Sequence, residues 1–496
     1  MGRRRRIAPL PALAFLAVSD SLCKTESVDR PQTKDQRPNM TPLSRDALKI
    51  WQAGVAAVGS EQLVHSAAKY DCDNIEFGDF RIRASDVDRV LVVGAGKAGT
   101  GMAAALEEIF GPDFGSSQRL EGWVNVPAGC ERSLEFLHLH PARPQGVNEP
   151  TEAGCEGTRR MLEMVGSAGP NDLCVCVLSG GGSALMPAPI AGICLDDKVA
   201  VTRHLSASGA NIDQLNTVRK QLSDIKGGGL LRACRAGRLV TLIISDVLGD
   251  PLDVIASGPT VSNTTGPGDA IDVLEKFGAR ETGIASNVFE VLKAGVEKPI
   301  APPPDCETHN LIIGNNSTAV EAAASMAASL GYAVEQESAA ASEGLVESVA
   351  DVLCNWAVDC LQKGGRHCLV SGGEPAVRLA PEPIRGKGGR NQQLVLATMQ
   401  RLAENSLTKG DLAKGDLVKG VVVLSGGTDG EDGPTDAAGA IADAEIMASA
   451  RQQGLDVADY LRRNDAYHFF QPLGALIQTG PTHTNVGDVR VVIVDA

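Results

Sequence analysis

The sequence predicts an α/β fold with mostly parallel sheets, and three observations support this class. Apolar runs typical of buried strands alternate with helical patterns along most of the chain. Many of these runs end in glycine-rich turns, and the 496 residues include 55 Gly. Aromatic residues make up only 3%, which suits small-residue helices and tight strand–helix connections. With 43% hydrophobic residues, the chain can bury the cores of two or three domains.

The predicted elements follow one another in a regular order. The segment 41–70 predicts a helix, because apolar residues recur at spacings of three and four and its first residues, TPLSRDA, supply capping chemistry. A strand, a glycine or polar turn and a helix are then predicted in each of three segments, 87–110, 171–186 and 309–331. Further strands are predicted in 238–251, 365–377, 421–424 and 489–496.

The predicted domain boundary is the proline-rich segment 297–309, because its three consecutive prolines cannot continue a helix or a central strand. We therefore expect a Rossmann-like α/β domain at 41–298 and a second α/β domain at 305–496, each an α/β/α sandwich. Residues 1–40 are expected to lie outside the fold. The four arginines at positions 3–6 and the short apolar stretch after them are typical of a mitochondrial presequence or a secretory signal, and the location expected for the protein is cytoplasmic or mitochondrial.

The composition excludes some classes of partner. The formal net charge of −15, from 46 basic and 61 acidic residues, argues against nucleic acid as the main partner. Small anionic ligands remain compatible, since a few local cations can outweigh the overall charge. The N-terminal apolar stretch is too short and too interrupted by proline to predict a membrane span. The 12 cysteines include no CxxC pair, so we expect reduced thiols in a reducing compartment.

The tripeptide Ser-Gly-Gly ends three predicted strands, at 179–181, 371–373 and 425–427. Ligands of doubly wound folds bind at the carboxyl ends of strands, so we expect these loops to converge on a ligand. The first loop is uncharged, and its backbone N–H groups and hydroxyls offer donors to a phosphate or carboxylate. Its predicted binding residues are Ser179, Gly180, Gly181, Gly182 and Ser183.

The third of these loops, SGGTDGEDGPTD, carries four carboxylates and neither Lys nor Arg, so it is poorly suited to hold a phosphate alone. Carboxylates suit a hard cation or a hydroxyl that is to be deprotonated. Another strand ends in SDVLGDP, which adds Asp246 and Asp250 as candidate ligands of Mg²⁺ or of a substrate hydroxyl. We predict Asp246 and Asp429 as the metal ligands, and a structural capping role stays open for Asp246 and Asp250.

Two basic residues complete the predicted site. Lys97 follows Gly96 within the glycine turn VVGAGKAGTG, where an ammonium group could contact a transferring phosphoryl group. The turn matches GxGxxG, but no acidic residue ends the next predicted strand, as dinucleotide binding requires, and a Walker A pattern is absent. Arg390 and Asn391 open a predicted helix, whose dipole favours anions, and we predict that Asn391 and Gly96 contact the ligand. Polar and basic residues at helical spacing in 215–230 fit either a ligand site or an ordinary amphipathic helix.

Together, these features are the parts that phosphoryl transfer needs: donors for an anion, cations that neutralise charge, and a carboxylate near the attacking hydroxyl. The same motifs resemble those of the class II glycerate kinases, also called glycerate 2-kinases, which carry a C-terminal MOFRL domain. The matching segments span most of the chain in the expected order: VVGAGKAG, LSGGGSAL, LNTVRKQLSDIKGGGL, SDVLGDPLDVIASGPT, GGEPAV, GGRNQQ, LSGGTDGEDGPTDAAGA, NDAYHFF and TNVGD.

The resemblance implies a kinase for D-glycerate that depends on ATP and Mg²⁺, with the active site in the cleft between two α/β domains. By motif match, the important residues of the family fall on Lys97, Arg390 and Asp429. Lys97 and Arg390 are expected to neutralise charge on the phosphoryl group or the glycerate carboxylate, and Asp429 to orient or deprotonate the hydroxyl. The expected product is 2-phosphoglycerate; transfer to the 3-hydroxyl stays open, and so does homodimer formation.

The sequence departs from the family pattern at two positions. Gln393 replaces a carboxylate in GGRNQQ, and His483 in GPTHTNV stands where the family usually has Gly. Neither change affects the three important residues, so we expect an active enzyme. Two alternative functions are an NAD(P)-dependent hydroxypyruvate reductase, which would use GAGKAG, and a metabolite-binding protein without catalysis.

Overall fold

The computed structural model describes residues 40–144, 149–284, 286–297, 305–408 and 419–496. The predicted targeting segment at 1–40, apart from Met40, and the prolines of the predicted linker lie outside the described residues. The described residues form one compact unit, in which they build two six-stranded sheets and one three-stranded sheet. No helix within the described ranges is long and apolar enough to cross a membrane.

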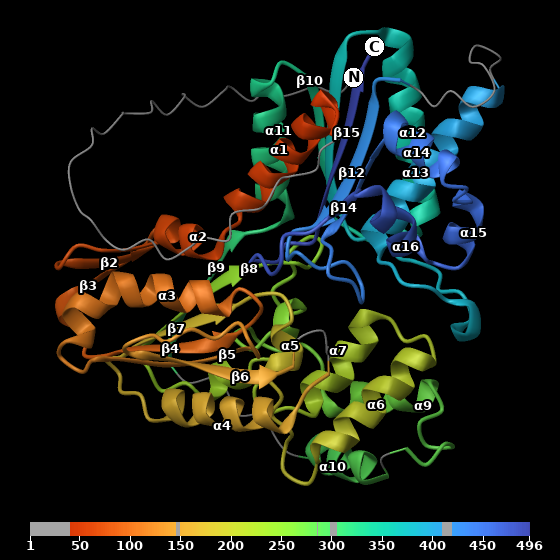
Figure 1. The fold of residues 1–496 in the computed structure, drawn as a ribbon. Coiled ribbons are helices and arrows are strands. Elements are labelled where there is room, and N and C mark those ends of the chain that lie inside the picture. The colour runs from red at the N-terminus through yellow and green to blue at the C-terminus, as the bar shows by residue number, and fades with distance from the viewer. Residues whose placement is uncertain (1–39, 145–148, 285, 298–304, 409–418) are drawn as a thin grey trace, which may run out of the picture. The chain divides into compact units, whose positions relative to one another are not determined.

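The first sheet has the strand order β6-β5-β4-β7-β8-β9, and all its neighbouring strands are parallel, as expected (Figure 1). Its strands are β4 (Val90–Ala95), β5 (Leu120–Pro127), β6 (Leu137–Arg143), β7 (Leu173–Leu178), β8 (Arg238–Ile244) and β9 (Glu307–Gly314). Every residue of β4 and β7 is buried. Helix α3 (Gly99–Phe110) covers one face and α4 (Glu152–Gly166) the other, which explains why these strands read as continuous apolar runs.

The carboxyl ends of three neighbouring strands lie at one edge of the first sheet. Because β4, β7 and β8 are parallel neighbours, the segments 96–98, 179–183 and 245–250 that follow them meet there. The short helix α5 (Gly182–Leu185) begins within the second of these segments. This edge supplies one wall of the candidate site.

The second sheet has the order β10-β11-β15-β12-β13-β14 and is mixed, which corrects the expectation of a mostly parallel sheet. Its strands are β10 (Ala333–Ser338), β11 (Arg366–Gly373), β12 (Val421–Gly427), β13 (Gly439–Asp443), β14 (Leu476–Ile477) and β15 (Asp488–Asp495). Among its described strands, β10 and β11 pair in parallel and the other pairings are antiparallel. The cause is that the final strand, β15, inserts between β11 and β12 in the opposite direction. Buried strands of either direction read as apolar runs, so the sequence pattern could not show this.

The insertion of β15 brings three distant chain segments to one edge of the second sheet. Asp488, the first residue of β15, lies opposite Gly373 of β11 and opposite Gly427 of β12. The Ser-Gly-Gly ends of β11 and β12 therefore flank Asp488. This edge supplies the other wall of the candidate site.

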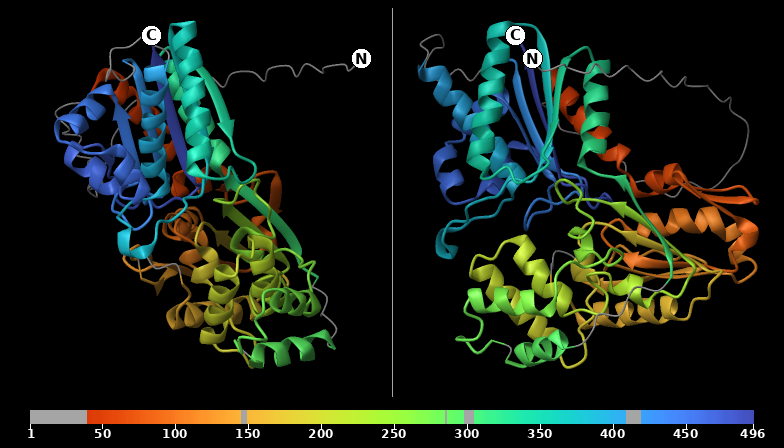
Figure 2. Two further views of the ribbon diagram at one scale, coloured as in Figure 1. Left: turned by 90° about the vertical axis from the view of Figure 1, so that its right-hand side faces the viewer. Right: turned by 180° about the vertical axis from the view of Figure 1, so that it is seen from behind.

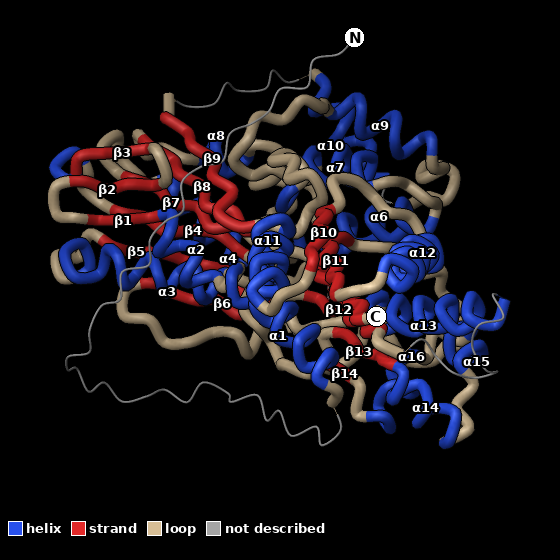
Figure 3. The backbone as a smooth tube through the Cα atoms, turned by 90° about the horizontal axis from the view of Figure 1, so that it is seen from above, coloured by secondary structure: helices blue, strands red, loops and turns tan. Residues whose placement is uncertain are grey.

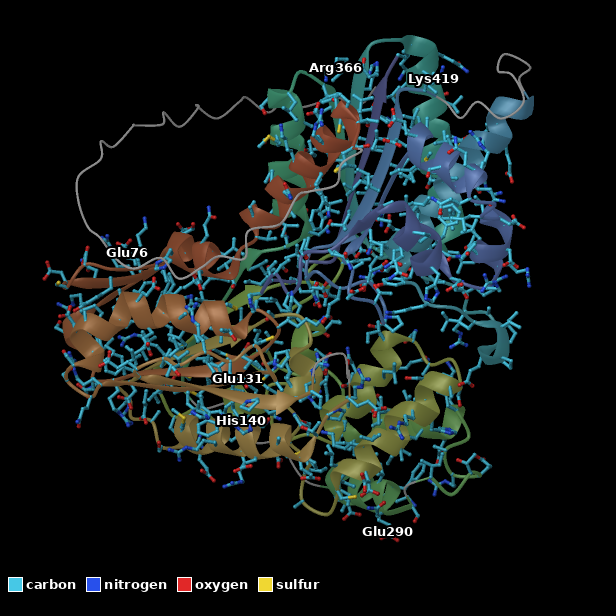
Figure 4. The ribbon with its side chains drawn as sticks, in the orientation of Figure 1. Glu76, Glu131, His140, Glu290, Arg366 and Lys419 are labelled. Carbon is cyan, nitrogen blue, oxygen red and sulfur yellow. The ribbon has the colours of Figure 1, made fainter. Side chains whose placement is uncertain are left out.

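Helix α1 (Pro42–Ala57) packs on the second sheet although it comes from the start of the described chain. It contacts α11 (Asn316–Ser329), and these two helices cover one face, while α12 (Val346–Lys363) and α13 (Arg390–Thr408) cover the other (Figure 3). The indole Nε1 of Trp51 donates a hydrogen bond to the Gly426 carbonyl oxygen at 3.1 Å. Arg366, labelled in Figure 4 at the start of β11, lies 3.6 Å from the Asp46 carboxylate of α1.

The change from the first sheet to the second does not coincide with the predicted boundary at 298–305. Strand β9 follows that boundary but pairs with β8 in the first sheet, and α1 precedes it but packs on the second sheet. The predicted helix at 41–70 also differs from the structure, because it is interrupted at Gly59 between α1 and α2 (Ser60–Ala67) and is followed by a strand. The first difference arises from packing between segments far apart in sequence, whereas the second is local, because Gly59 separates the helices and β1 pairs with the neighbouring strand β2 (Asn74–Phe77).

The remaining elements surround the two sheets. Four helices pack around a separate apolar cluster beside the first sheet (Figure 2). They are α6 (Leu195–Ala207), α7 (Ile212–Gln221), α9 (Pro267–Lys276) and α10 (Ser286–Val296). The other strands and helices are β1 (Ala68–Tyr70), β2 (Asn74–Phe77), β3 (Phe80–Arg83), α8 (Gly229–Ala233), α14 (Ala444–Gln452), α15 (Val457–Arg462) and α16 (Ala466–Phe470).

The packing of α1 predicts a large stability loss on truncation of Trp51. This indole is 1% exposed against the second sheet, so Trp51→Ala leaves a cavity and an unpaired carbonyl. We expect the free energy of unfolding in urea to fall by about 3–5 kcal/mol. The control Val352→Ala, at a side chain that is 63% exposed, should change it by less than about 0.5 kcal/mol. Equal effects of the two substitutions would contradict the placement of α1.

Candidate active site

The two sheet edges enclose a cleft with a volume of about 1060 Å³. The first sheet contributes Lys97, Arg143, Gly181 and Asp246 to its walls. The second sheet contributes Glu374, Arg390 and the acidic loop from Asp429 to Asp436. The structure therefore brings all three residues of the predicted catalytic set, Lys97, Arg390 and Asp429, into one cleft.

The glycine turn that carries Lys97 is fixed by the first Ser-Gly-Gly loop. Gly96 has a φ of +154°, and a Cβ there would lie 1.9 Å from the Ser179 hydroxyl oxygen, so only glycine fits. The Ser179 hydroxyl accepts a hydrogen bond from the backbone N–H of Ala98 at 3.0 Å, and the Gly180 carbonyl accepts one from the N–H of Lys97 at 2.9 Å. Ser179 therefore joins two loops, which is a different position from the ligand donor that we predicted.

The side chain of Lys97 crosses to the acidic loop. Its Nζ lies 2.9 Å from Asp429 Oδ2 and 2.7 Å from Glu431 Oε2. Burial lowers the pKa of Lys97, but the charges and hydrogen bonds of Asp429 and Glu431 outweigh burial, so the pKa lies above its ordinary value. Lys97 is therefore a fixed cation whose two carboxylate partners face the same cleft.

The carboxylates of the acidic loop have different environments. Asp429 Oδ1 accepts a hydrogen bond from the backbone N–H of Glu431 at 3.0 Å, which orients it toward Lys97. Asp432 is 2% exposed and accepts from the backbone N–H groups of Asn391 and Gln392, so it caps the start of α13. Burial raises the pKa of Asp432 to about 7, and the two N–H groups counter that shift. Within the acidic loop, Asp429 therefore faces the cleft, whereas Asp432 stabilises the start of α13.

Arg390, at the start of α13, is held by two carboxylates. Its Nε lies 2.6 Å from Asp488 Oδ2, and its Nη1 lies 2.5 Å from Glu374 Oε1. Asn391 Nδ2 also donates to Asp488 Oδ1, at 2.9 Å. Burial lowers the pKa of Arg390, but its ion pairs outweigh this effect and hold the pKa well above the ordinary value. Asn391 is buried and acts on the cleft through Asp488, whereas we predicted it to contact the ligand.

The rest of the first Ser-Gly-Gly loop lies mostly behind the cleft wall. Gly181 lines the cleft, whereas Gly180 lies beneath the side chains of Asp246 and Asn485. Ser183 accepts hydrogen bonds from Lys226 Nζ through its hydroxyl at 2.6 Å and through its carbonyl at 2.7 Å. Gly182 is buried against the Ala95 carbonyl. Lys226 therefore supports the loop from inside the protein, and Gly181 is the position that reaches the cleft.

Asp246 and Asp250 separate into different environments. Asp246 lines the cleft, and its Oδ2 accepts a hydrogen bond from Asn485 Nδ2 at 2.8 Å. Asp250 lies outside the cleft, where it accepts from Asn315 Nδ2 at 2.6 Å at the start of α11. A small cavity of about 90 Å³ runs between the two aspartates.

The carboxylates of the cleft are the candidate ligands for a metal ion. The described residues contain no group of three or more His, Cys, Asp or Glu side chains that could enclose a metal ion. Asp246 and Asp429 both line the cleft, and the charge of Asp429 contributes to the raised pKa of Asp246. Two carboxylates that repel each other suit a cation that takes its other ligands from water and phosphate, as Mg²⁺ does. The residues therefore fit Mg²⁺ bound together with a phosphorylated substrate.

The two departures from the family motifs have separate structural settings. Gln393 is buried, and its Nε2 donates to the Leu461 carbonyl at 3.1 Å, a bond that a carboxylate could not make. His483 lines the cleft and has a φ of +57°, a conformation that favours glycine. Its imidazole therefore occupies cleft space that a glycine would leave open.

Sequence reasoning missed Arg143, Asn485 and Asp488. Arg143 ends β6, and its signal in the sequence is a basic residue within the segment HLHPARP. Asn485 and Asp488 belong to the motif TNVGD, which was matched without a role. Their roles depend on the insertion of β15 between two other strands, which no local pattern indicates.

Comparison with known proteins agrees with this architecture. Residues 46–293 match a family described as a domain of unknown function (DUF4147), and residues 367–488 match the MOFRL family. The chain is 34% identical to the glycerate kinase of Bos taurus, over 90% of this chain and 92% of that protein. It is 38% identical to an Agrobacterium vitis protein named "Putative hydroxypyruvate reductase", over 82% of this chain and 99% of that protein.

A solved structure shows the same fold. The glycerate kinase of Thermotoga maritima superposes with a TM-score of 0.73 at 31% identity, over 91% of this chain and 99% of that chain. The fold and cleft define an α/β protein of the type that carries a C-terminal MOFRL domain. The chain belongs to the class II glycerate kinase family.

The environment of Asp246 predicts a pH-dependent stability. Burial, followed by the charge of Glu374, raises the pKa of Asp246 from its ordinary value of 3.8 to about 6. Between these values the folded protein holds the proton more tightly than the unfolded chain, so Asp246 lowers stability as the pH rises through the window. The unfolding free energy of Asp246→Asn minus that of the unmodified protein should therefore increase by about 2 kcal/mol when the pH rises from about 4 to about 6.5. Urea unfolding of both proteins at the two pH values tests this prediction. The same difference in unfolding free energy at both pH values would contradict it.

Proposed function

We propose that the protein is a glycerate kinase that transfers the γ-phosphoryl group of ATP to the 2-hydroxyl of D-glycerate. The observation that carries this proposal is the Lys97–Asp429 ion pair, which places a cation and a carboxylate from opposite walls in one cleft with Arg390. The names of the bovine, human and Thermotoga relatives support the substrate. Transfer to the 3-hydroxyl is the alternative regiochemistry.

In the proposed reaction, Asp429 accepts the proton of the attacking hydroxyl while Lys97 and Arg390 offset negative charge on the transferring group. Asp429 is suited to this role because Lys97 and the Glu431 N–H fix both of its oxygens. Charge neutralisation and positioning are the main requirements of phosphoryl transfer. Mg²⁺ held by Asp246 and Asp429 would neutralise phosphate oxygens when bound.

A second candidate function is an NAD(P)-dependent hydroxypyruvate reductase, because the Agrobacterium vitis relative carries that name. Dinucleotide binding calls for an acidic residue at the end of β5, to hold the ribose. The end of β5 carries no acidic residue, and its one polar side chain near that end, Asn125, is buried and donates to the carbonyl oxygens of Gly154 and Leu185. Oxidation of NADH by hydroxypyruvate in the absence of ATP would support the reductase over the kinase.

We expect Lys97→Ala and Asp429→Asn each to lower the kcat of D-glycerate phosphorylation by at least about 100-fold, because each substitution removes one member of the Lys97–Asp429 pair. The rate of ADP formation measures this kcat. Glu431→Gln is the matched comparison, since Glu431 also contacts Lys97 but is 43% exposed. It should reduce kcat far less than Asp429→Asn. Circular dichroism spectra should stay unchanged. Normal turnover by either of the first two variants would contradict their assigned roles.

The cellular location, cytoplasmic or mitochondrial, and homodimer formation stay predictions. They are independent of the cleft chemistry and do not affect the tests above.

A further inference from the structure

Arg143 is a cleft residue that the sequence motifs did not identify. It ends β6, and its carbonyl accepts a hydrogen bond from the N–H of Ala128 at 2.8 Å, so its backbone position is fixed. Its side chain lines the cleft although the residue is only 5% exposed. The guanidinium lies beside Gly181: a Cβ on that glycine would be 3.1 Å from Arg143 Nη2 and 3.7 Å from Lys97 Cγ. Arg143 and Lys97 therefore both lie beside Gly181, at the same part of the cleft.

Arg143 differs from the other main cations of the cleft in its partners. Lys97 and Arg390 each contact two carboxylates, at distances between 2.5 and 2.9 Å. Arg143 forms no ion pair within the described part of the chain, and its buried Nε has no hydrogen-bond partner there. Burial lowers the pKa of Arg143, and the charge of Glu431 counters this only in part. A buried guanidinium without a counter-ion is costly, and an anionic ligand would remove that cost.

We propose that Arg143 binds the carboxylate of the acceptor substrate, a small 2-hydroxy acid. The planar guanidinium can hold a carboxylate through two parallel hydrogen bonds. In a 2-hydroxy acid the hydroxyl is on the carbon next to the carboxylate, so an acid held beside Gly181 and Lys97 presents that hydroxyl to Asp429, which lies 2.9 Å from Lys97 Nζ. A polyol without a carboxylate leaves Arg143 unpaired and is rejected. This inference rests on the proposed glycerate kinase activity.

The test compares Arg143→Gln with the matched control Arg159→Gln, at an exposed arginine of α4. Calorimetric titration of the full chain with D-glycerate alone measures acceptor binding without turnover. We expect Arg143→Gln to weaken D-glycerate binding by about 10- to 100-fold, and Arg159→Gln to leave it unchanged. Binding of D-glyceramide, which lacks the carboxylate charge, should be weak and should respond little to Arg143→Gln. The KM for the nucleotide should stay unchanged.

Several results would overturn the inference. Equal losses for D-glycerate and D-glyceramide would show a structural role, and a rise in the nucleotide KM with normal D-glycerate binding would assign the guanidinium to phosphate. If Arg143→Gln fails to fold, Arg143→Lys keeps the charge without the planar fork and should bind D-glycerate with intermediate affinity; unmodified affinity would contradict the proposal. Normal D-glycerate binding by Arg143→Gln refutes this inference alone. Absence of both binding and phosphorylation in the unmodified protein refutes the proposed function too.

Discussion

The contact of Lys97 with Asp429 and Glu431 joins the two walls of the cleft and sets how the acidic loop faces the first sheet. Lys97 is positioned by a turn that packs against the Ser179 loop, so the ammonium group follows the first sheet. The two carboxylates follow β12 of the second sheet. Separation of the walls would leave three charged groups without partners in a partly buried site, which is unfavourable. The pair therefore defines the distance at which the phosphate-binding and hydroxyl-activating groups face each other.

The loop after β12 is rich in both glycine and carboxylates, although glycine-rich turns usually bind anions. The structure explains this combination, because the carboxylates have separate roles. Asp429 faces Lys97, whereas Asp432 turns inward and caps α13, which fixes Arg390 and Asn391 beside Asp488. Asp436 accepts a hydrogen bond from the Tyr467 hydroxyl at 2.7 Å and belongs to the loop's own support. The loop thus combines one carboxylate for chemistry with others that hold the local structure.

Local sequence signals predicted the elements that a short sequence pattern is sufficient to identify. The apolar runs at β4 and β7, the glycine turn at Gly96 and the motif residues Lys97, Arg390 and Asp429 all lie where the sequence placed them. The features that the sequence could not predict depend on pairing between distant segments. They include the antiparallel insertion of β15, the packing of α1 on the second sheet and the helix cap formed by Asp432. Arg143 belongs with them, because its unpaired state depends on how the other cleft charges pair.

The proposed reaction of this cleft is phosphorylation of D-glycerate on its 2-hydroxyl. Phosphorus NMR of the product formed from ATP, Mg²⁺ and D-glycerate tests it most directly. We expect a new phosphomonoester signal split into a doublet by the single proton on the carbon that bears the phosphate. A triplet would place the phosphate on the 3-oxygen and contradict the regiochemistry. Absence of any new phosphomonoester, with intact ATP, would contradict the claim as a whole.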